Sequence, residues 1–294
     1  MKNYIFFRGK RLLILAGIVA IVYLLACISI RLGQNRLVFV PSKTIKTTPA
    51  DLGLSYQEVW IPVSPGKQER LHGWWIPATS PQIGVLLYLH GNGENIGANV
   101  EQAMEFHQLG LDVLLFDYRG YGESDGKFPT ETQVYQDAQV AWDYLVQQKG
   151  IPPQDIFVYG QSLGGAIAID LAVRNPSIRG LIVESTFTSM RDMVDHQRIY
   201  SLFPADLLLT QKFNSKSKVS SLKMPVLLIH GTSDPVVPAY MSRVLFDTIT
   251  GSKQLFLVPD ADHYNVAPVA GKEYQQRIRA FIQQNRGNPR PQLS

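Results

Sequence analysis

The hydrophobic pattern of the chain begins with one long apolar run. Residues 12–30 carry no charge and are bounded by Arg11 and Arg31. At about 1.5 Å per residue, a helix of this length nearly matches a hydrocarbon core of roughly 30 Å. The apolar core of a secretory signal peptide is shorter, about 7 to 15 residues. A buried core helix rarely lies at the start of a chain with charges at both ends. The pattern therefore predicts a single-pass transmembrane anchor.

After residue 56 the pattern changes to short apolar runs separated by turn residues. The extended runs 57–63 and 71–78 predict an antiparallel hairpin. The later runs are continuous and rich in Leu or β-branched residues, which is typical of strands buried on both faces. These runs are residues 83–89, 113–117, 156–159, 181–183, 226–229 and 255–258.

Helical patterns fill the intervals between the continuous runs. The clearest is 130–148, which starts with Thr130 and Gln133 in a capping-box spacing and is followed by Gly150. The others are residues 99–109, 163–174, 239–248 and 273–284. Strands that alternate with helices predict an α/β fold with a mostly parallel central sheet flanked by helices.

The predicted organisation has five parts. These are a basic N-terminus (1–11), a transmembrane anchor (12–30), a juxtamembrane connector (31–56), an α/β domain (57–285) and a flexible tail (286–294). Within the domain, the segment from about 187 to 222 has no strand pattern and combines scattered aromatic residues with a polar stretch. We expect this segment to form a small helical cap over one edge of the sheet.

The basic charge of the chain lies around the apolar run. The net charge is +4, but residues 1–46 hold eight of the 28 Lys and Arg and none of the 24 Asp and Glu. Residues 47–294 therefore carry 20 basic and 24 acidic side chains, which argues against nucleic-acid binding. Four basic residues precede the apolar run and four follow it, so the positive-inside rule leaves the orientation in the membrane open.

Cys27 is the only cysteine in the chain. An intrachain disulfide and a cysteine-rich metal site are therefore excluded. The sequence LLAC at this position resembles a bacterial lipoprotein cleavage site, at which the cysteine would carry a lipid. The favoured interpretation is a small apolar residue inside a membrane helix. Both interpretations tether the domain to a membrane.

A serine stands where a predicted strand meets a predicted helix. Residues 158–165 read VYGQSLGG, which places Ser162 in a Gly-x-Ser-x-Gly frame. The frame alone is weak evidence, but the strand before it and the small-residue helix after it are the context of a nucleophile elbow. A serine hydroxyl attacks at neutral pH only with a base and an orienting carboxylate nearby.

A histidine and an aspartate later in the chain are the candidates for the base and the orienting carboxylate. His263 lies after the last predicted strand, and Asp234 follows the run 226–229. The order Ser162, Asp234, His263 is that of an α/β-hydrolase triad. Each of the three residues falls just beyond the carboxyl end of a different strand, where open α/β sheets place their sites. These three residues are the predicted catalytic set.

Other residues compete for these roles. Glu184, at the end of the 181–183 run, is the main rival for the acid. His90 and His230 both precede a glycine at a strand end, and their favoured role is to shape a loop by hydrogen bonding. Asp260 and Asp262 flank His263 and are also expected to shape their loop.

An acyl-transfer site needs donors for the developing oxyanion. The backbone N–H of Leu163, next to the serine, is the first candidate. The second is expected from the loop HGNGENIG at residues 90–97, with Asn92 and Gly93 as alternatives. A phosphate cradle is the other interpretation of this loop, but the loop lacks the G-x-x-x-x-G-K-[ST] frame. No metal or organic cofactor is predicted.

Five motifs in this order resemble the α/β-hydrolase superfamily, in particular its membrane-anchored α/β-hydrolase-domain serine hydrolases. The motifs are YLHGNGENIG, FDYRGYGESDG, VYGQSLGG, IHGTSDPVVP and DADHYN. The resemblance covers about residues 57–285 and implies an α/β-hydrolase fold and a Ser-His-Asp triad. It also implies that Asp117 and Arg119 shape a loop and are not catalytic. The family includes protein depalmitoylases with a cysteine-rich, lipidated N-terminus, whereas this chain has one cysteine and an apolar span.

The predicted function is a membrane-tethered serine hydrolase that cleaves carboxylic esters or thioesters. The substrate is a small-molecule or lipid-like acyl compound, and the apolar cap stretch 199–210 favours the lipid-like class. Two alternatives remain. A serine peptidase of the S33 type would use the same triad and needs an acidic pocket for a free peptide N-terminus. A non-catalytic membrane scaffold would not need the intact triad.

Overall fold

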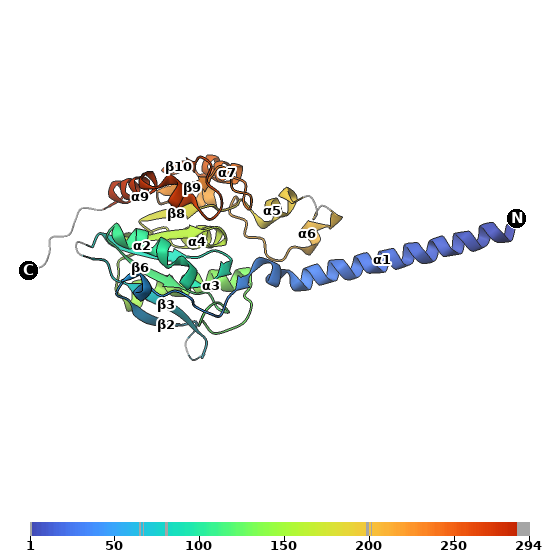
Figure 1. Cartoon of the computed structure of the whole chain (residues 1–294), viewed down its shortest axis with the longest axis horizontal. Helices are drawn as coiled ribbons and strands as arrows, with labels where there is room; N and C mark the ends of the chain where they lie inside the picture. Colours follow the sequence, from blue (N-terminus) through green and yellow to red (C-terminus); the bar gives the residue numbers. More distant parts are fainter. Residues whose placement is uncertain are drawn as a thin grey trace, which may run out of the picture.

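A central sheet organises the part of the chain that the structure describes (Figure 1). The computed structural model describes residues 2–286, except positions 65, 67, 80, 81, 198, 199 and 201, with side chains from residue 12 onward. The strands of the large sheet are β2 (Gln57–Pro62), β3 (Arg70–Ile76), β4 (Gly84–Leu89), β6 (Leu111–Phe116), β7 (Ile156–Gln161), β8 (Gly180–Glu184), β9 (Val226–Gly231) and β10 (Lys253–Val258).

The strand order in this sheet is β10-β9-β8-β7-β4-β6-β3-β2. Neighbouring strands are parallel except that β3 is antiparallel to both β2 and β6. The predicted hairpin and the mostly parallel sheet are therefore confirmed. The continuous apolar runs form the central strands because helices cover the sheet on both sides, so that side chains on both faces are buried.

Six helices of the described domain pack on the sheet. They are α2 (Val100–Gln108), α3 (Glu131–Asp143), α4 (Leu163–Arg174), α7 (Tyr240–Thr248), α8 (Val266–Ala270) and α9 (Lys272–Gln284). Buried side chains of α3, α4 and α7 belong to one core cluster, whereas those of α2, α8 and α9 belong to a second. The predicted helix 130–148 passes into a π-helical turn after α3, and α8 was not predicted.

The N-terminal helix is longer than the apolar run. Helix α1 (Lys2–Val38) continues through residues 31–38, so the first part of the predicted connector is helical. No proline occurs before Pro41, and the end of the helix is fastened to the domain. The buried side chain of Gln34 makes hydrogen bonds of 2.8–3.1 Å with the backbone of residues 208–211.

By length and composition, α1 could cross a membrane from residue 12 to residue 38. The boundary at residue 30 marks the end of the charge-free run and not the end of the helix.

The remainder of the predicted connector is part of the folded domain. Phe39 is fully buried and packs edge-to-face against Phe213. Strand β1 (Val40–Pro41) then pairs in parallel with β5 (Gly93–Glu94), which belongs to the loop after β4. The local pattern of residues 39–56 does not reveal this pairing, because the partner strand lies about fifty residues further along the chain.

The described part of the predicted cap segment contains two short α-helices between β8 and β9. They are α5 (Met190–His196) and α6 (Ala205–Leu208). Both helices and α1 lie on the same side of the domain (Figure 1). Residues 287–294 of the predicted tail lie outside the described residues.

Replacement of Gly164 by alanine is expected to destabilise the fold. A Cβ at this position would lie 2.1 Å from the carbonyl oxygen of Leu89, so helix α4 would have to move away from β4. We expect a loss of about 1–3 kcal/mol or more in the free energy of unfolding. Urea unfolding of the full chain in detergent measures this loss.

Gly251→Ala is the matched control, because the nearest atom to its added Cβ would be 3.8 Å away. Equal stability losses in the two variants would contradict the close approach of α4 and β4.

Candidate active site

Ser162 lies at the sharp turn between β7 and α4. Its backbone has φ 53° and ψ −118°, a strained conformation for a non-glycine residue that costs about 1–3 kcal/mol. Two hydrogen bonds of 2.8 Å hold the turn: the N–H of Ser162 donates to the carbonyl of Glu184, and the carbonyl of Ser162 accepts from the hydroxyl of Thr186. The turn thus presents the serine hydroxyl beyond the carboxyl end of β7.

The two glycines of the Gly-x-Ser-x-Gly frame allow close backbone packing. A Cβ at Gly160 would lie 2.3 Å from the carbonyl oxygen of Gly164. A Cβ at Gly164 would collide with the carbonyl oxygen of Leu89, at the end of β4. Side chains at these positions would push α4 away from the sheet, so the frame is explained by the geometry of the turn.

His263 connects the serine to a carboxylate. Its Nε2 lies 3.0 Å from Oγ of Ser162, and its Nδ1 lies 2.6 Å from Oδ2 of Asp234. A carboxylate only accepts hydrogen bonds, so Nδ1 carries the proton and Nε2 of the neutral ring can accept from the serine hydroxyl. Asp262 shapes this loop, since its carboxylate accepts from the backbone N–H groups of residues 264–265.

Asp234 has a buried side chain that receives donors on both oxygens. Oδ1 accepts from the backbone N–H groups of Val236 and Val237 at 2.8 Å each. Oδ2 faces His263 and, at 3.2 Å, Nε2 of His230. Burial opposes ionisation of this carboxyl group, but the hydrogen bonds from His230 and His263 outweigh burial and hold the pKa of Asp234 well below its usual range.

His230 is therefore part of the site as well as of its loop. The ring is fully buried, and its Nε2 lies 2.9 Å from the carbonyl oxygen of Val237 in addition to its contact with Asp234. Both neighbours are acceptors, so Nε2 carries a proton. Nδ1 lies 2.7 Å from the hydroxyl of Ser242. The sequence predicts a loop-shaping role for His230, and the spacing of four residues between His230 and Asp234 is the signal that could have indicated a role in the site.

The competing residues lie nearby but make other contacts. Glu184 is buried, and its Oε2 accepts from the hydroxyl of Tyr274 at 2.6 Å. His90 is also buried, and its Nδ1 lies 2.8 Å from the carbonyl oxygen of Gly91. The structure thus brings Asp234 into contact with His263 and gives both competitors different partners.

The three predicted oxyanion donors lie around Ser162. Leu163 is the first residue of α4, so its N–H has no partner within the helix. Asn92 and Gly93 line the same cavity as Ser162. The loop that carries them is fixed to the end of α1, because the carbonyl and the side-chain amide of Asn92 make hydrogen bonds of 2.9 and 3.1 Å with the backbone of residues 38–40.

Asp117 and Arg119 have structural contacts, as the resemblance implied. A side-chain oxygen of Asp117 accepts from the backbone N–H of Ile96 at 3.0 Å, which holds the loop that follows β4. The guanidinium of Arg119 pairs with the buried carboxylate of Asp137 on α3. These contacts fix the loop after β6 between α3 and the loop after β4.

Comparisons with known proteins agree with this architecture. One family profile, described as serine aminopeptidase, S33, matches residues 80–216, and another, described as PhoPQ-activated pathogenicity-related protein, matches residues 178–294. The alpha/beta hydrolase domain-containing protein WAV2 of Arabidopsis thaliana is 32% identical over 232 residues, which are 72% of this chain and 74% of that protein. The chain belongs to the α/β-hydrolase superfamily.

Further relatives of this α/β hydrolase are found in a yeast and in a bacterium. Protein bem46 of Schizosaccharomyces pombe is 35% identical over 204 residues, which cover 68% of this chain and 67% of that protein. An uncharacterized protein of Mycobacterium tuberculosis is 34% identical over 250 residues, which are 85% of this chain and 87% of that protein.

Among solved structures, an esterase of Pyrococcus furiosus superposes with a TM-score of 0.69 at 22% identity, over 85% of this chain and 98% of that chain. An alpha-beta hydrolase of Vibrio vulnificus gives a TM-score of 0.62 at 26% identity, over 78% of this chain and 82% of that chain. The predicted fold is therefore confirmed.

The cavity at Ser162 of this hydrolase has a volume of about 450 Å³. It extends between the loop after β4, helix α2 and the start of α8, and it combines polar and apolar groups. Three carboxyl groups line it, those of Glu94, Glu101 and Glu184. The site thus has room for a substrate group next to the serine and an acidic wall.

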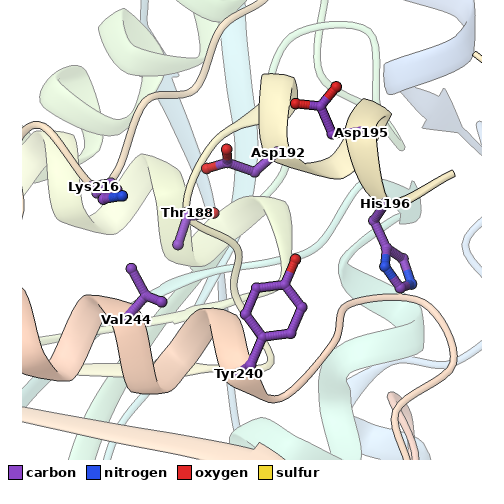
Figure 2. Close-up of a pocket in the computed structure, with 7 residues that line it drawn as sticks. All are labelled: Thr188, Asp192, Asp195, His196, Lys216, Tyr240 and Val244. Atoms are coloured by element: carbon purple, nitrogen blue, oxygen red, sulfur yellow. The ribbon is translucent and has the colours of Figure 1, made fainter. Parts of the chain in front are cut away.

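A second pocket, of about 390 Å³, lies between the cap and α7 (Figure 2). Asp192, Asp195 and His196 come from α5, and Tyr240 and Val244 come from α7. Its described lining includes none of the residues around the serine hydroxyl. Among the residues that the structure describes, no group of three or more His, Cys, Asp or Glu side chains could hold a metal ion.

Glu184→Gln is expected to reduce the pH dependence of stability. Burial raises the pKa of Glu184 and outweighs the hydrogen bond from Tyr274. The carboxyl group therefore binds its proton more tightly in the folded than in the unfolded state. Its contribution to stability is complete below the unfolded pKa of about 4.3 and is lost as the pH rises through the raised, folded value. A glutamine has no proton to lose, so the variant gains stability relative to the wild type as the pH rises.

Urea unfolding of both proteins between about pH 4 and pH 8 measures this difference. Glu101→Gln, which changes an exposed carboxylate at the rim of the same cavity, is the matched control. Parallel stability curves for wild type and Glu184→Gln would contradict the raised pKa.

Proposed function

We propose that this protein is a membrane-anchored serine hydrolase that cleaves carboxylic esters or thioesters. The observation that carries the proposal is the continuous hydrogen-bond chain from Ser162 through His263 to Asp234, with distances of 3.0 and 2.6 Å. The strained backbone of the serine supports the same conclusion, because such strain is concentrated at functional sites.

In the proposed reaction, Oγ of Ser162 attacks the acyl carbon while its proton moves to Nε2 of His263. The ring becomes positively charged, and the ionised carboxylate of Asp234 stabilises it and keeps Nδ1 as the donor. The depressed pKa of Asp234 suits this role because the carboxylate stays ionised throughout the working pH range.

The negative charge that develops on the acyl oxygen needs donors in place before the reaction. The N–H of Leu163 is the first, and the N–H of Asn92 or Gly93 is the second. The protonated His263 then gives its proton to the leaving alcohol or thiol, and an acyl-serine remains. Water, deprotonated by the same ring, releases the carboxylic acid and restores the serine.

The helix α1 supports the membrane-anchored part of the proposal. Its segment Leu12–Val38 has the length and hydropathy of a membrane span, and only 6% of its most apolar window is buried against the protein. An anchored enzyme meets acyl substrates at the bilayer, so lipid-like esters are the substrate class that fits this arrangement best.

Ser162→Ala is expected to abolish labelling by a fluorophosphonate probe and to lower the turnover of p-nitrophenyl butyrate by at least about 10⁴-fold. Both readouts depend on the serine oxygen, which the variant lacks. Gel fluorescence measures the labelling, and the absorbance of the released nitrophenolate measures the turnover. Both are measured on the full chain in detergent. A folded wild type that is neither labelled nor active would refute the proposed function.

Asp234→Asn is expected to lower kcat by about 10⁴-fold, because an amide lets the ring of His263 adopt the wrong tautomer. Glu184→Gln is the matched control and is expected to keep most of the activity, since its carboxyl group contacts Tyr274 and not the imidazole. The opposite outcome, with the glutamate essential and the aspartate dispensable, would show that the acid is misassigned.

A peptidase of the S33 type is the second candidate. The matching profile for residues 80–216 and the three carboxyl groups around the Ser162 cavity favour it, because an acidic wall suits the ammonium group of a peptide N-terminus. Aminoacyl p-nitroanilides distinguish the two candidates. Turnover of these amides above that of p-nitrophenyl esters would favour the peptidase.

A further inference from the structure

The tip of the cap, residues 200 and 202–209, contacts α1 at a residue of the predicted membrane span. The hydroxyl of Tyr23 donates a hydrogen bond of 3.0 Å to the carbonyl oxygen of Leu202. The ring of Tyr23 stacks on that of Phe203, with ring centroids 5.8 Å apart and an angle of 5° between the planes. Tyr23 precedes Ile30, the last residue of the charge-free run, by seven positions, or about 10 Å along the helix axis.

Further contacts continue along α1 toward the domain. The guanidinium of Arg31 donates a hydrogen bond of 2.6 Å to the carbonyl oxygen of Leu207. Gln34 then binds the backbone of residues 208–211, as described above. The cap segment 202–211 therefore runs beside α1 from Tyr23 to Gln34. Since both ends of the segment are fastened, its depth relative to the span is fixed by α1.

Two apolar side chains at this tip are unusually exposed. Leu202 and Leu207 are 71% and 73% exposed, and they are the two exposed leucines among the described residues of the domain. Tyr200 beside them is 40% exposed. The acidic residue of the tip, Asp206, is paired with Arg191 at 2.8 Å. In water this surface would be unfavourable, because each exposed leucine forgoes the free energy of burial.

An apolar hollow separates the cap from α1. It has a volume of about 220 Å³ and is lined largely by aliphatic and aromatic side chains, among them Ile30, Leu37, Met193, Phe203 and Leu208. The hollow lies at the end of the apolar run of α1, beside the exposed leucines. A hydrocarbon chain is the kind of group that fits such a lining.

From these contacts we infer that the cap tip, residues 200 and 202–209, is a second membrane contact that inserts into the same leaflet as the adjoining part of α1. Its partner is the acyl-chain region of a lipid bilayer, which covers the two leucines and fills the hollow. The depth of about 10 Å given by Tyr23 agrees with that of interfacial amphipathic elements, which bury their apolar face roughly 5–10 Å into the boundary between headgroups and acyl chains.

This inference rests on the membrane-anchored part of the proposed function and adds an orientation to it. The loop of Asn92, which lines the Ser162 cavity, is hydrogen-bonded to the end of α1. Two membrane contacts, α1 and the cap tip, would restrict rotation of the domain about the anchor. The carboxyl edge of the sheet, with Ser162, then faces the bilayer surface, and esters of membrane lipids are the substrates within its reach.

Site-specific fluorescence in phosphatidylcholine vesicles tests the inference. The full chain carries Cys27→Ala to remove its own thiol, and Leu202→Cys or Leu207→Cys is labelled with bimane. We expect quenching by phosphatidylcholine with a nitroxide on its acyl chain, and at least about 5-fold weaker quenching by aqueous iodide than at an exposed site, because lipid excludes the ion. Two matched labels give the reference values. Ile18→Cys lies in the span, and Val269→Cys marks an exposed apolar residue of α8.

Each outcome is decisive. Lipid quenching at positions 202 and 207 that approaches the value at 18 supports the inference. If these positions match 269 while 18 is quenched by lipid, the cap tip lies in water and the inference is overturned. If 18 itself is accessible to iodide, the anchor is wrong and the inference is overturned with it. None of these readouts requires catalysis, so inactivity of the Ser162 variants would refute the hydrolase proposal without affecting them.

Discussion

The close contact between helix α4 and strands β4 and β7 is the constraint on which the site depends. Gly160 and Gly164 permit it, and a side chain at either position would collide with backbone atoms. Because the helix begins so close to the sheet, the connecting residue must turn sharply, and Ser162 accepts a positive φ. That turn presents the hydroxyl at the carboxyl edge and leaves the first N–H groups of α4 beside it.

The same edge of the sheet collects every other part of the candidate site. The loops after β9 and β10 bring Asp234 and His263 to the serine, and the loop after β4 brings the candidate oxyanion donors. The loop after β4 also pairs with β1, directly after α1. The segment that predicts a membrane anchor is therefore joined to the proposed catalytic centre by backbone hydrogen bonds and not by a free linker.

The local sequence pattern predicted the strands and helices well where one physical cause, such as burial or helix capping, determined them. Continuous apolar runs became strands buried on both faces, and the capping box at Thr130 began a helix as expected. The structure of the connector at 31–56 was not evident from the sequence, for a physical reason. Its helical end and its strand β1 are held by contacts with the cap and with the loop at residues 93–94, and neither partner is near in sequence.

The fold class, the nucleophile frame and the order of Ser162, Asp234 and His263 could be read from the chain alone, because periodicity, glycine spacing and chain order are local or ordinal properties. Tertiary packing determines which of two carboxyl groups reaches the imidazole, since Asp234 follows β9, Glu184 ends β8, and each has a different partner. It also decided the place of His230 and the contact of the cap with α1. Those contacts join residues far apart in the chain, and only packing in three dimensions brings them together.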